Sequence, residues 1–161
     1  MIFVTLGTDP HNFNRLIEYI ELLKLEGIIK EKIILQYGYT HLFQKVKGIT
    51  YMDFCPPEKF RHYLKQANFI ISHGGLGNIL QAINLQKKVI VVPRLKKFNE
   101  HENNHQLELS EQLFSEKKII LAQDRASLAR AIKSIKKFKP ALKKERSVSK
   151  LLVLDFINKF K

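Results

Sequence analysis

The chain has 161 residues, enough for one domain with a buried core, and its 45% hydrophobic content is ordinary for a globular protein. Its single cysteine, Cys55, excludes an intrachain disulfide, and no stretch approaches the roughly 20 apolar residues that span a bilayer. The net charge of +13 lies almost entirely in residues 117–161, which carry 14 Lys/Arg against 3 Asp/Glu. We therefore expect a cytoplasmic chain whose attraction for anionic partners belongs to its C-terminal segment.

The pattern of apolar residues predicts strands that alternate with helices along the chain. Residues 1–6 form a buried strand, and Asp9 and Pro10 are expected to begin a helix that Gly27 ends. A strand follows at 32–38, and residues 41–54 suggest a short helix and then a strand around Ile49–Phe54. The remaining elements, in order, are a helix at 55–67, a strand at 68–72, a loop at 73–78, a helix at 78–86, a strand at 88–93, a polar loop at 94–104, a helix at 105–116, a strand at 118–123 and helical patterns to the end.

This alternation predicts an α/β fold with a parallel sheet that is covered by helices on both faces. Three of the strand-to-helix junctions carry unusual polar chemistry: "GTD", "SHGGLGN" and "PRLKKFNEHENNHQ". Because the carboxyl ends of parallel strands meet at one edge of a sheet, these junctions should lie together. Ligands bind at that edge in such folds, so it is the predicted binding site.

Three of the seven glycines lie in "HGGLGN", between a predicted strand and a predicted helix. Glycine permits positive φ and close approach of a ligand, and a helix N-terminus offers free N–H groups that suit phosphate. The P-loop pattern is absent, and the dinucleotide pattern fails because Leu80 stands where its third glycine belongs. The loop therefore indicates either a phosphate site of another class or a tight turn around a satisfied His73.

Metal chemistry finds little support in the sequence. There is no H-E-x-x-H motif and no set of paired cysteines, and His101 and His105 are more typical of a solvated surface. No two aspartates are separated by one residue, so an Asp-x-Asp site for a metal and a diphosphate is absent. A nucleotide diphosphate would have to be bound by backbone N–H groups and cationic side chains.

The motifs "VTLGTDPHNFNRLI", "ISHGGLGNILQAI", "KVIVVPR" and "NNHQLELSEQL", in this order, resemble the C-terminal, donor-binding domain of family-28 glycosyltransferases. The likeness runs from Met1 to about Ile120. It is greatest to small single-domain members, namely bacterial exopolysaccharide and capsule subunits and the eukaryotic catalytic subunit that transfers N-acetylglucosamine in N-glycan assembly. The resemblance implies a Rossmann-like domain similar to the C-terminal half of a GT-B enzyme. It also implies a UDP-sugar donor and no cofactor or metal.

The resemblance assigns substrate-binding residues by position. They are Gly7 and Thr8 at the diphosphate, Phe54 at the uracil, His73, Gly74, Gly75, Gly77 and Asn78 at the nucleotide, Gln81 at the ribose, and Asn104, His105 and Gln106 at the sugar and phosphates.

Several of these positions have simpler interpretations. Phe54 could be a core residue, Asn104 could only cap the following helix, and Gln106 could be a solvated helix residue. Gln81 departs from the family, which usually has a glutamate there; an amide can still bond the ribose but without charge assistance. The catalytic base is unknown, and His73 is a weak candidate that more simply orients the loop or contacts phosphate.

A GT-B enzyme works in a cleft between two domains, and we expect residues 1–161 to form only one, with 127–161 as a basic helical tail. The resemblance implies a membrane-anchored partner subunit that holds a lipid-linked saccharide acceptor. The chain would then lie at the inner face of the cell membrane. The tail suggests either two packing helices with solvated basic faces or a docking surface for an anionic membrane or the partner.

The sequence thus predicts the donor-binding catalytic subunit of a two-component enzyme that transfers a hexose from a UDP-sugar in bacterial polysaccharide synthesis. One alternative is a regulatory subunit that binds a nucleotide sugar without catalysis. A further alternative, from charge alone, is a nucleic-acid-binding module. Against the latter, most of the basic excess lies away from the three junctions, and the tail has few aromatic residues for base stacking.

Overall fold

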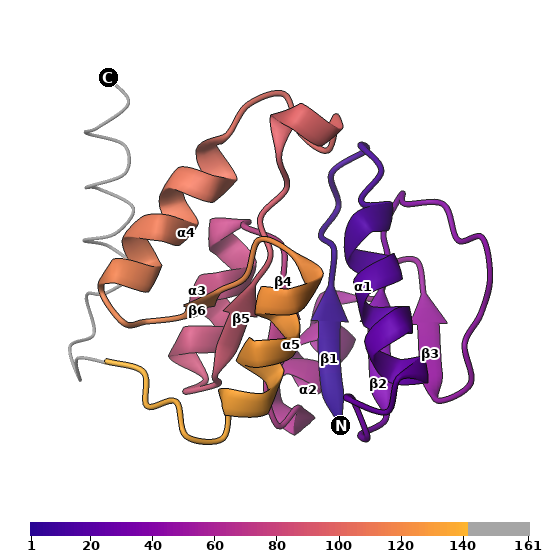
Figure 1. Ribbon diagram of the computed structural model, residues 1–161, viewed down its shortest axis with the longest axis horizontal. Helices are drawn as coiled ribbons and strands as arrows, with labels where there is room; N and C mark the ends of the chain where they lie inside the picture. Colours follow the sequence, from indigo (N-terminus) through magenta and orange to yellow (C-terminus); the bar gives the residue numbers. More distant parts are fainter. Residues whose placement is uncertain (142–161) are drawn as a thin grey trace.

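The computed structural model describes residues 1–141 and has six parallel strands in one sheet (Figure 1). The strand order is β3-β2-β1-β4-β5-β6, so the chain moves outward from β1 to one edge and then returns to build the other side. This is the order of a doubly wound nucleotide-binding fold. The strands are β1 (Ile2–Thr5), β2 (Ile33–Gln36), β3 (Ile49–Met52), β4 (Ile70–Ser72), β5 (Val89–Val91) and β6 (Ile120–Leu121). The predicted α/β fold class is confirmed.

Helices cover both faces of the sheet, as expected for a parallel sheet. They are α1 (Asn14–Leu25), α2 (Pro57–Gln66), α3 (Leu76–Asn84), α4 (His105–Ser115) and α5 (Arg125–Ser134), with a 3-10 turn at Lys96–Phe98. Helices α1 and α5 pack on one face, in a core that includes Val4, Leu35 and Ile90. Helices α2, α3 and α4 pack on the other, against neighbours such as Phe3 and Val91. No helix within residues 1–141 has the length and apolar character needed to cross a membrane.

The sheet register aligns the carboxyl ends of the central strands. Thr5 at the end of β1 pairs with Gln36 of β2 and with Ser72 of β4, and Ser72 pairs in turn with Val91 of β5. The direction of winding reverses between β1 and β4, so the loops that follow these two strands diverge and leave a crevice. The predicted junctions after β1, β4 and β5 therefore do share one edge of the sheet.

Two predicted helix starts are wrong. Asp9 does not cap a helix; its carboxylate accepts from the backbone N–H of His11 in a local turn, and α1 begins only at Asn14. Helix α3 begins earlier than expected, at Leu76, with Gly75 at the N-cap. As a result Gly77 lies in the first helical turn rather than in a loop.

The structure differs from the expected pattern at residues 41–48, and it describes only part of the expected C-terminal tail. Residues 41–48 form no helix, and the chain passes directly into β3. At the C-terminal end, α5 packs into the core through Leu128, Ala131 and Ile132, with Phe138 partly buried beside them. The rest of the tail, residues 142–161, lies outside the described residues, and so do the second expected helix and the docking surface.

A buried polar network joins the β1–α1 loop to the segment after β5. Arg94 is 1% exposed and donates to the carbonyls of Leu6 (2.9 Å) and His11 (2.7 Å). Arg15 forms a two-pronged ion pair with Glu100, at 2.8 and 2.7 Å. Bidentate, largely buried pairs of this kind are geometrically restrictive, so they hold both loops in fixed positions at the edge of the sheet.

Candidate functional site

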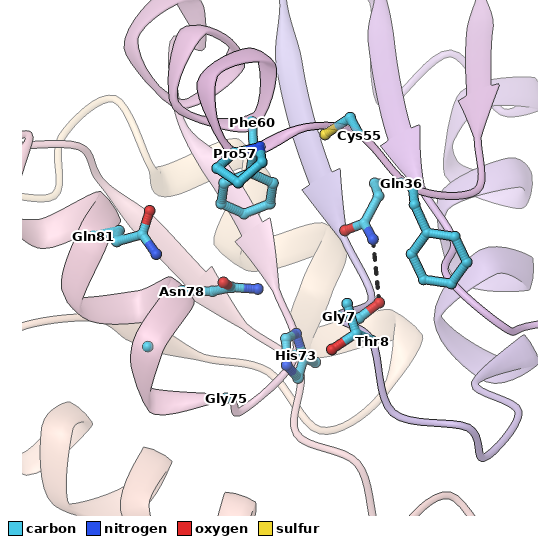
Figure 2. Close-up of a pocket in the computed structure, with 12 residues that line it drawn as sticks. Gly7, Thr8, Gln36, Cys55, Pro57, Phe60, His73, Gly75, Asn78 and Gln81 are labelled. Carbon is cyan, nitrogen blue, oxygen red and sulfur yellow. Dashed lines mark hydrogen bonds between the residues drawn. The ribbon is translucent and has the colours of Figure 1, made fainter.

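A pocket of about 350 Å³ lies at the point where the winding reverses (Figure 2). The loops after β1 and β4 form its floor, and the first turns of α2 and α3 form its walls. Its lining residues are Gly7, Thr8, Gln36, Phe54, Cys55, Pro57, Phe60, His73, Gly75, Gly77, Asn78 and Gln81. Eight of the twelve predicted site residues therefore line a single cavity; Gly74, Asn104, His105 and Gln106 do not.

His73 stands between the two glycine-bearing loops and packs against both. A Cβ added at Gly7 would lie 2.5 Å from the His73 ring, and one added at Gly75 would also collide with it. Gly7 has φ +79°, a conformation that other residues rarely adopt. Burial, followed by the nearby charge of Arg94, lowers the pKa of His73 to about 4. His73 is therefore a neutral ring that supports the loops, with Nδ1 3.4 Å from the Thr5 carbonyl.

Gly74 and Gln106 join the glycine loop to the start of α4. The Gln106 amide oxygen accepts from the backbone N–H of Gly74 (3.1 Å) and from that of Arg94 (3.2 Å). A Cβ at Gly74 would approach Cβ of Gln106 to 2.6 Å. Gln106 is thus no freely solvated helix residue, because its amide oxygen fixes two loops to each other.

Gly77 differs from the other glycines of the loop because a Cβ there would meet no atom within 4 Å. It lines the pocket in the first turn of α3, where backbone N–H groups have no partner within the helix. The positive end of the helix dipole adds to these donors, and no acidic side chain lies in this turn to neutralise them. The arrangement suits a phosphate group, and Gly77 leaves room for it.

The opposite side of the pocket is more apolar. Phe54 is 43% exposed rather than a core residue, and its ring packs edge-on against Tyr39 with centroids 4.9 Å apart. Pro57 and Phe60 of α2 continue this surface. Gln81 lines the cavity from the other wall, farther along α3 from the glycine loop than Asn78 (Figure 2). The pocket could therefore hold a flat aromatic group on the side of Phe54 and a polar ring on the side of Gln81.

Sequence reasoning missed Gln36, Cys55, Pro57 and Phe60 as lining residues. Gln36 accepts from the Thr5 hydroxyl (2.5 Å) and donates to the Gly7 carbonyl (3.2 Å), so it holds the β1–α1 loop in place. A polar residue at the end of a buried strand was the available signal. Cys55 is a thiol whose pKa is raised by partial burial, which leaves it protonated.

Asn104 and His105 lie outside the cavity, at the start of α4. Asn104 occupies the N-cap position, but its side chain makes no capping bond; its oxygen accepts from the Lys96 backbone N–H at 3.1 Å. His105 is the first residue of the helix and its Nδ1 lies 3.3 Å from Glu108. Both adjoin Gln106, whose hydrogen bond to Gly74 places the start of α4 next to the glycine loop. Among residues 1–141 no group of three or more His, Cys, Asp or Glu side chains could hold a metal ion.

Several solved glycosyltransferase structures with the GT-B fold share this architecture. The chain is similar to the calicheamicin glycosyltransferase CalG4 (TM-score 0.63, 14% identity), covering 98% of this chain and 38% of that one. It is also similar to the NMR structure of ALG13 (TM-score 0.65, 20% identity), covering 97% and 96% of the two chains. The fold is Rossmann-like and corresponds to one half of a GT-B glycosyltransferase.

The sequence comparison defines the family. The model of the glycosyltransferase family 28 C-terminal domain matches residues 1–159, and the chain belongs to this family. Its curated relatives include the UDP-N-acetylglucosamine transferase subunit ALG13 of Yarrowia lipolytica, 29% identical over 84% of this chain and 70% of that protein. The human protein of the same name is 30% identical over 71% of this chain. The matched part of the chain covers only 10% of the human protein's length.

Proposed function

We propose that this chain is the donor-binding catalytic subunit of a two-component glycosyltransferase. It would transfer a hexose from a UDP-sugar to a lipid-linked acceptor in bacterial surface polysaccharide assembly. The observation that carries the proposal is the pocket between β1 and β4, where the open position at Gly77 meets the unpaired N–H groups of α3. Membership of the family and the likeness to transferase subunits support the same conclusion.

The donor would bind along the pocket in a definite order. The diphosphate would accept from the first N–H groups of α3 and lie against the backbone of Gly7 and Thr8. The ribose would reach Gln81, whose amide can accept from one hydroxyl and donate to the other. The uracil would occupy the apolar end near Phe54. The sugar would then project toward the rim formed by the segment before α4.

This binding mode uses no metal, because helix N–H groups supply the neutralising charge. A second subunit would supply the other wall of the cleft. Glycosyl transfer requires the acceptor hydroxyl to be held in line with the anomeric carbon, and one Rossmann-like half has no opposing surface to hold it. We propose a membrane-anchored acceptor-binding partner, which would recruit this chain to the inner face of the membrane. The relatives are named as transferase subunits, which is consistent with such an assembly.

Thermal denaturation with a panel of ligands tests the donor site. UDP and UDP-sugars should raise the melting temperature in the presence of EDTA, whereas ATP and NAD should not. At a ligand concentration of 100 times Kd the stabilisation should be about 2.7 kcal/mol, which corresponds to several degrees. UDP-N-acetylglucosamine is the first sugar to test, because the relatives are named for it. No shift with any uridine nucleotide would contradict the proposal, and a shift only with magnesium would contradict its metal-free part.

A further inference from the structure

A compact group of charged and titratable side chains lies beside the pocket, on the connection that follows Gly7 and Thr8. It consists of Asp9 and His11 from the β1–α1 loop and His101 from the segment before α4, with buried Arg94 beneath them. Both connections lie at the upper end of the sheet in Figure 1. The nucleotide site described above uses none of these three acid and imidazole groups.

The His11 ring is held in one orientation by Asp9. Asp9 Oδ1 accepts from the His11 backbone N–H at 2.9 Å and lies 2.7 Å from Nδ1 of the same residue. Burial would raise the pKa of Asp9, but these hydrogen bonds and the charge of Arg94 lower it, so Asp9 is a carboxylate. A carboxylate can only accept, and the proton of a neutral His11 ring is therefore on Nδ1. In that neutral tautomer Nε2 is the acceptor, as in a histidine base oriented by aspartate.

The backbone of His11 is fixed independently of its side chain. Arg94 donates to the carbonyls of both His11 and Leu6, so the intervening turn is closed on one guanidinium group. This places His11 close to the start of the loop whose Gly7 and Thr8 line the pocket. The His11 side chain is 36% exposed and its Nε2 has no hydrogen bond within residues 1–141. The ring is held in place, yet one nitrogen is open to an incoming group.

The other two histidines near the pocket lack this combination. The Nδ1 of His101 accepts from the backbone N–H of Asn103 (3.3 Å), and its Nε2 faces Asp9 at 3.6 Å. His73 is 7% exposed, and both glycine loops pack on its ring. Of these three, only His11 combines a side chain that is 36% exposed with a ring nitrogen that has no hydrogen bond within residues 1–141.

We propose that His11, oriented by Asp9, is the general base that this chain brings to the acceptor hydroxyl, an inference that rests on the transferase function proposed above. Nε2 takes the hydroxyl proton while the acceptor oxygen forms its bond to the anomeric carbon. The bond from that carbon to the β-phosphate oxygen breaks, and its electron pair leaves with UDP. Asp9 stabilises the imidazolium that results. The chemistry of transfer is then divided, with the base on the donor subunit and the acceptor held by the partner.

Transfer can be measured with membranes from the source organism, prepared from cells that lack this chain and supplemented with the purified protein. The substrates are radiolabelled UDP-N-acetylglucosamine, UDP-glucose, UDP-galactose and UDP-glucuronic acid. His11→Asn should lower transfer by roughly 100-fold or more, the usual contribution of a general base, with the UDP-induced thermal shift unchanged. Asp9→Asn should lower it less. His62→Asn, on the exposed surface of α2 away from the pocket, is the matched control and should transfer normally.

Two further measurements separate a base from a structural residue. Imidazole added to His11→Gly should restore part of the activity, which would not occur if the ring only supported the loop. In the isolated chain, ¹⁵N spectra of the ring should show the tautomer protonated at Nδ1.

Near-normal transfer by His11→Asn, a loss of UDP binding in that variant, or a ring protonated at Nε2 would each overturn the inference while leaving the transferase function in place. A wild-type chain that binds UDP but transfers no sugar would overturn the transferase function and this assignment together.

Discussion

Gly75 and Gly77 are two residues apart in the same loop, yet the space around them differs: the protein's own packing requires glycine at Gly75 but not at Gly77. At Gly75 a side chain would collide with His73, so glycine is needed for packing within the protein. At Gly77 a side chain would meet nothing and would project into space at the pocket wall. A glycine-rich loop at a helix start is therefore not uniformly a ligand-binding element. The inner half of the loop, residues 73–75, is packed within the protein and shapes the site. Only the outer half, residues 76–78, is left open for a ligand.

The largest effect should come from Gly7→Ala, in the β1–α1 loop that packs against His73 from the other side. Alanine would adopt φ near +79° with strain and would also press on the His73 ring, for a combined loss of about 4 kcal/mol of folding stability. Gly27→Ala is the matched control, because it has φ +71° but no atom within 4 Å of the added Cβ. It should lose only the strain, about 1 kcal/mol. Urea denaturation measures both. Equal losses would show that His73 does not pack against Gly7 as described.

Acid should destabilise the inner half through His73. Its pKa is lowered to about 4 in the folded chain, whereas an unfolded histidine has a pKa of about 6.5. Between these values the unfolded state binds one more proton, so stability falls as pH falls from about 6.5 toward 4, by about 3 kcal/mol in all. Urea denaturation across this range should show the loss in the wild type and in His62→Asn. It should be absent from any folded variant that lacks His73. Stability that is flat across this interval would mean that His73 is readily protonated.

The outer half should respond in binding rather than in stability. Gly77→Val places a branched side chain where the phosphate is proposed to lie, and UDP should bind about 30-fold more weakly, a cost of about 2 kcal/mol. Its melting temperature without ligand should stay near that of the wild type, because nothing surrounds the new side chain. In Gly75→Val the melting temperature without ligand should fall, because the side chain would collide with His73. Calorimetric titration with UDP tests the pair, and unaltered affinity in Gly77→Val would place the diphosphate elsewhere.

Gln81 should give the smallest of these effects. If its amide bonds the ribose, Gln81→Ala should weaken UDP binding by about 1 kcal/mol, the usual net value of one hydrogen bond. Gln81→Glu should bind at least as tightly, because a carboxylate can accept from both ribose hydroxyls. The same titration measures both variants. Identical affinities for Gln, Ala and Glu would show that this wall of the pocket does not contact the ribose.

The sequence predicted the features that depend on local patterns. Apolar runs identified the strands, the prolines identified the start of α2, and the carboxyl ends of the parallel strands located the site. The start of α1 was wrong because the Asp9 carboxylate bonds the His11 backbone and ring instead of a helical N–H. Local propensity cannot distinguish these two partners for the same side chain.

Features that depend on distant residues could not be predicted in this way. Gln36 supports Gly7, which is 29 positions away, and Arg94 joins the carbonyls of Leu6 and His11, which are 88 and 83 positions away. Nor does the sequence distinguish Gly75 from Gly77, because the difference lies in whether His73 fills the adjacent space. Such roles are set by tertiary packing, and only the folded arrangement shows them.

A crystal structure of the chain with UDP is the most direct test of the central claim that the open half of the glycine loop is a nucleotide diphosphate site. The account predicts phosphate oxygens hydrogen-bonded to the first backbone N–H groups of α3 and to the Gly7–Thr8 segment, with the ribose toward Gln81 and the uracil toward Phe54. UDP bound elsewhere, for example in the second pocket lined by Lys30, Lys88 and Lys136, or with its phosphates away from Gly77, would contradict it.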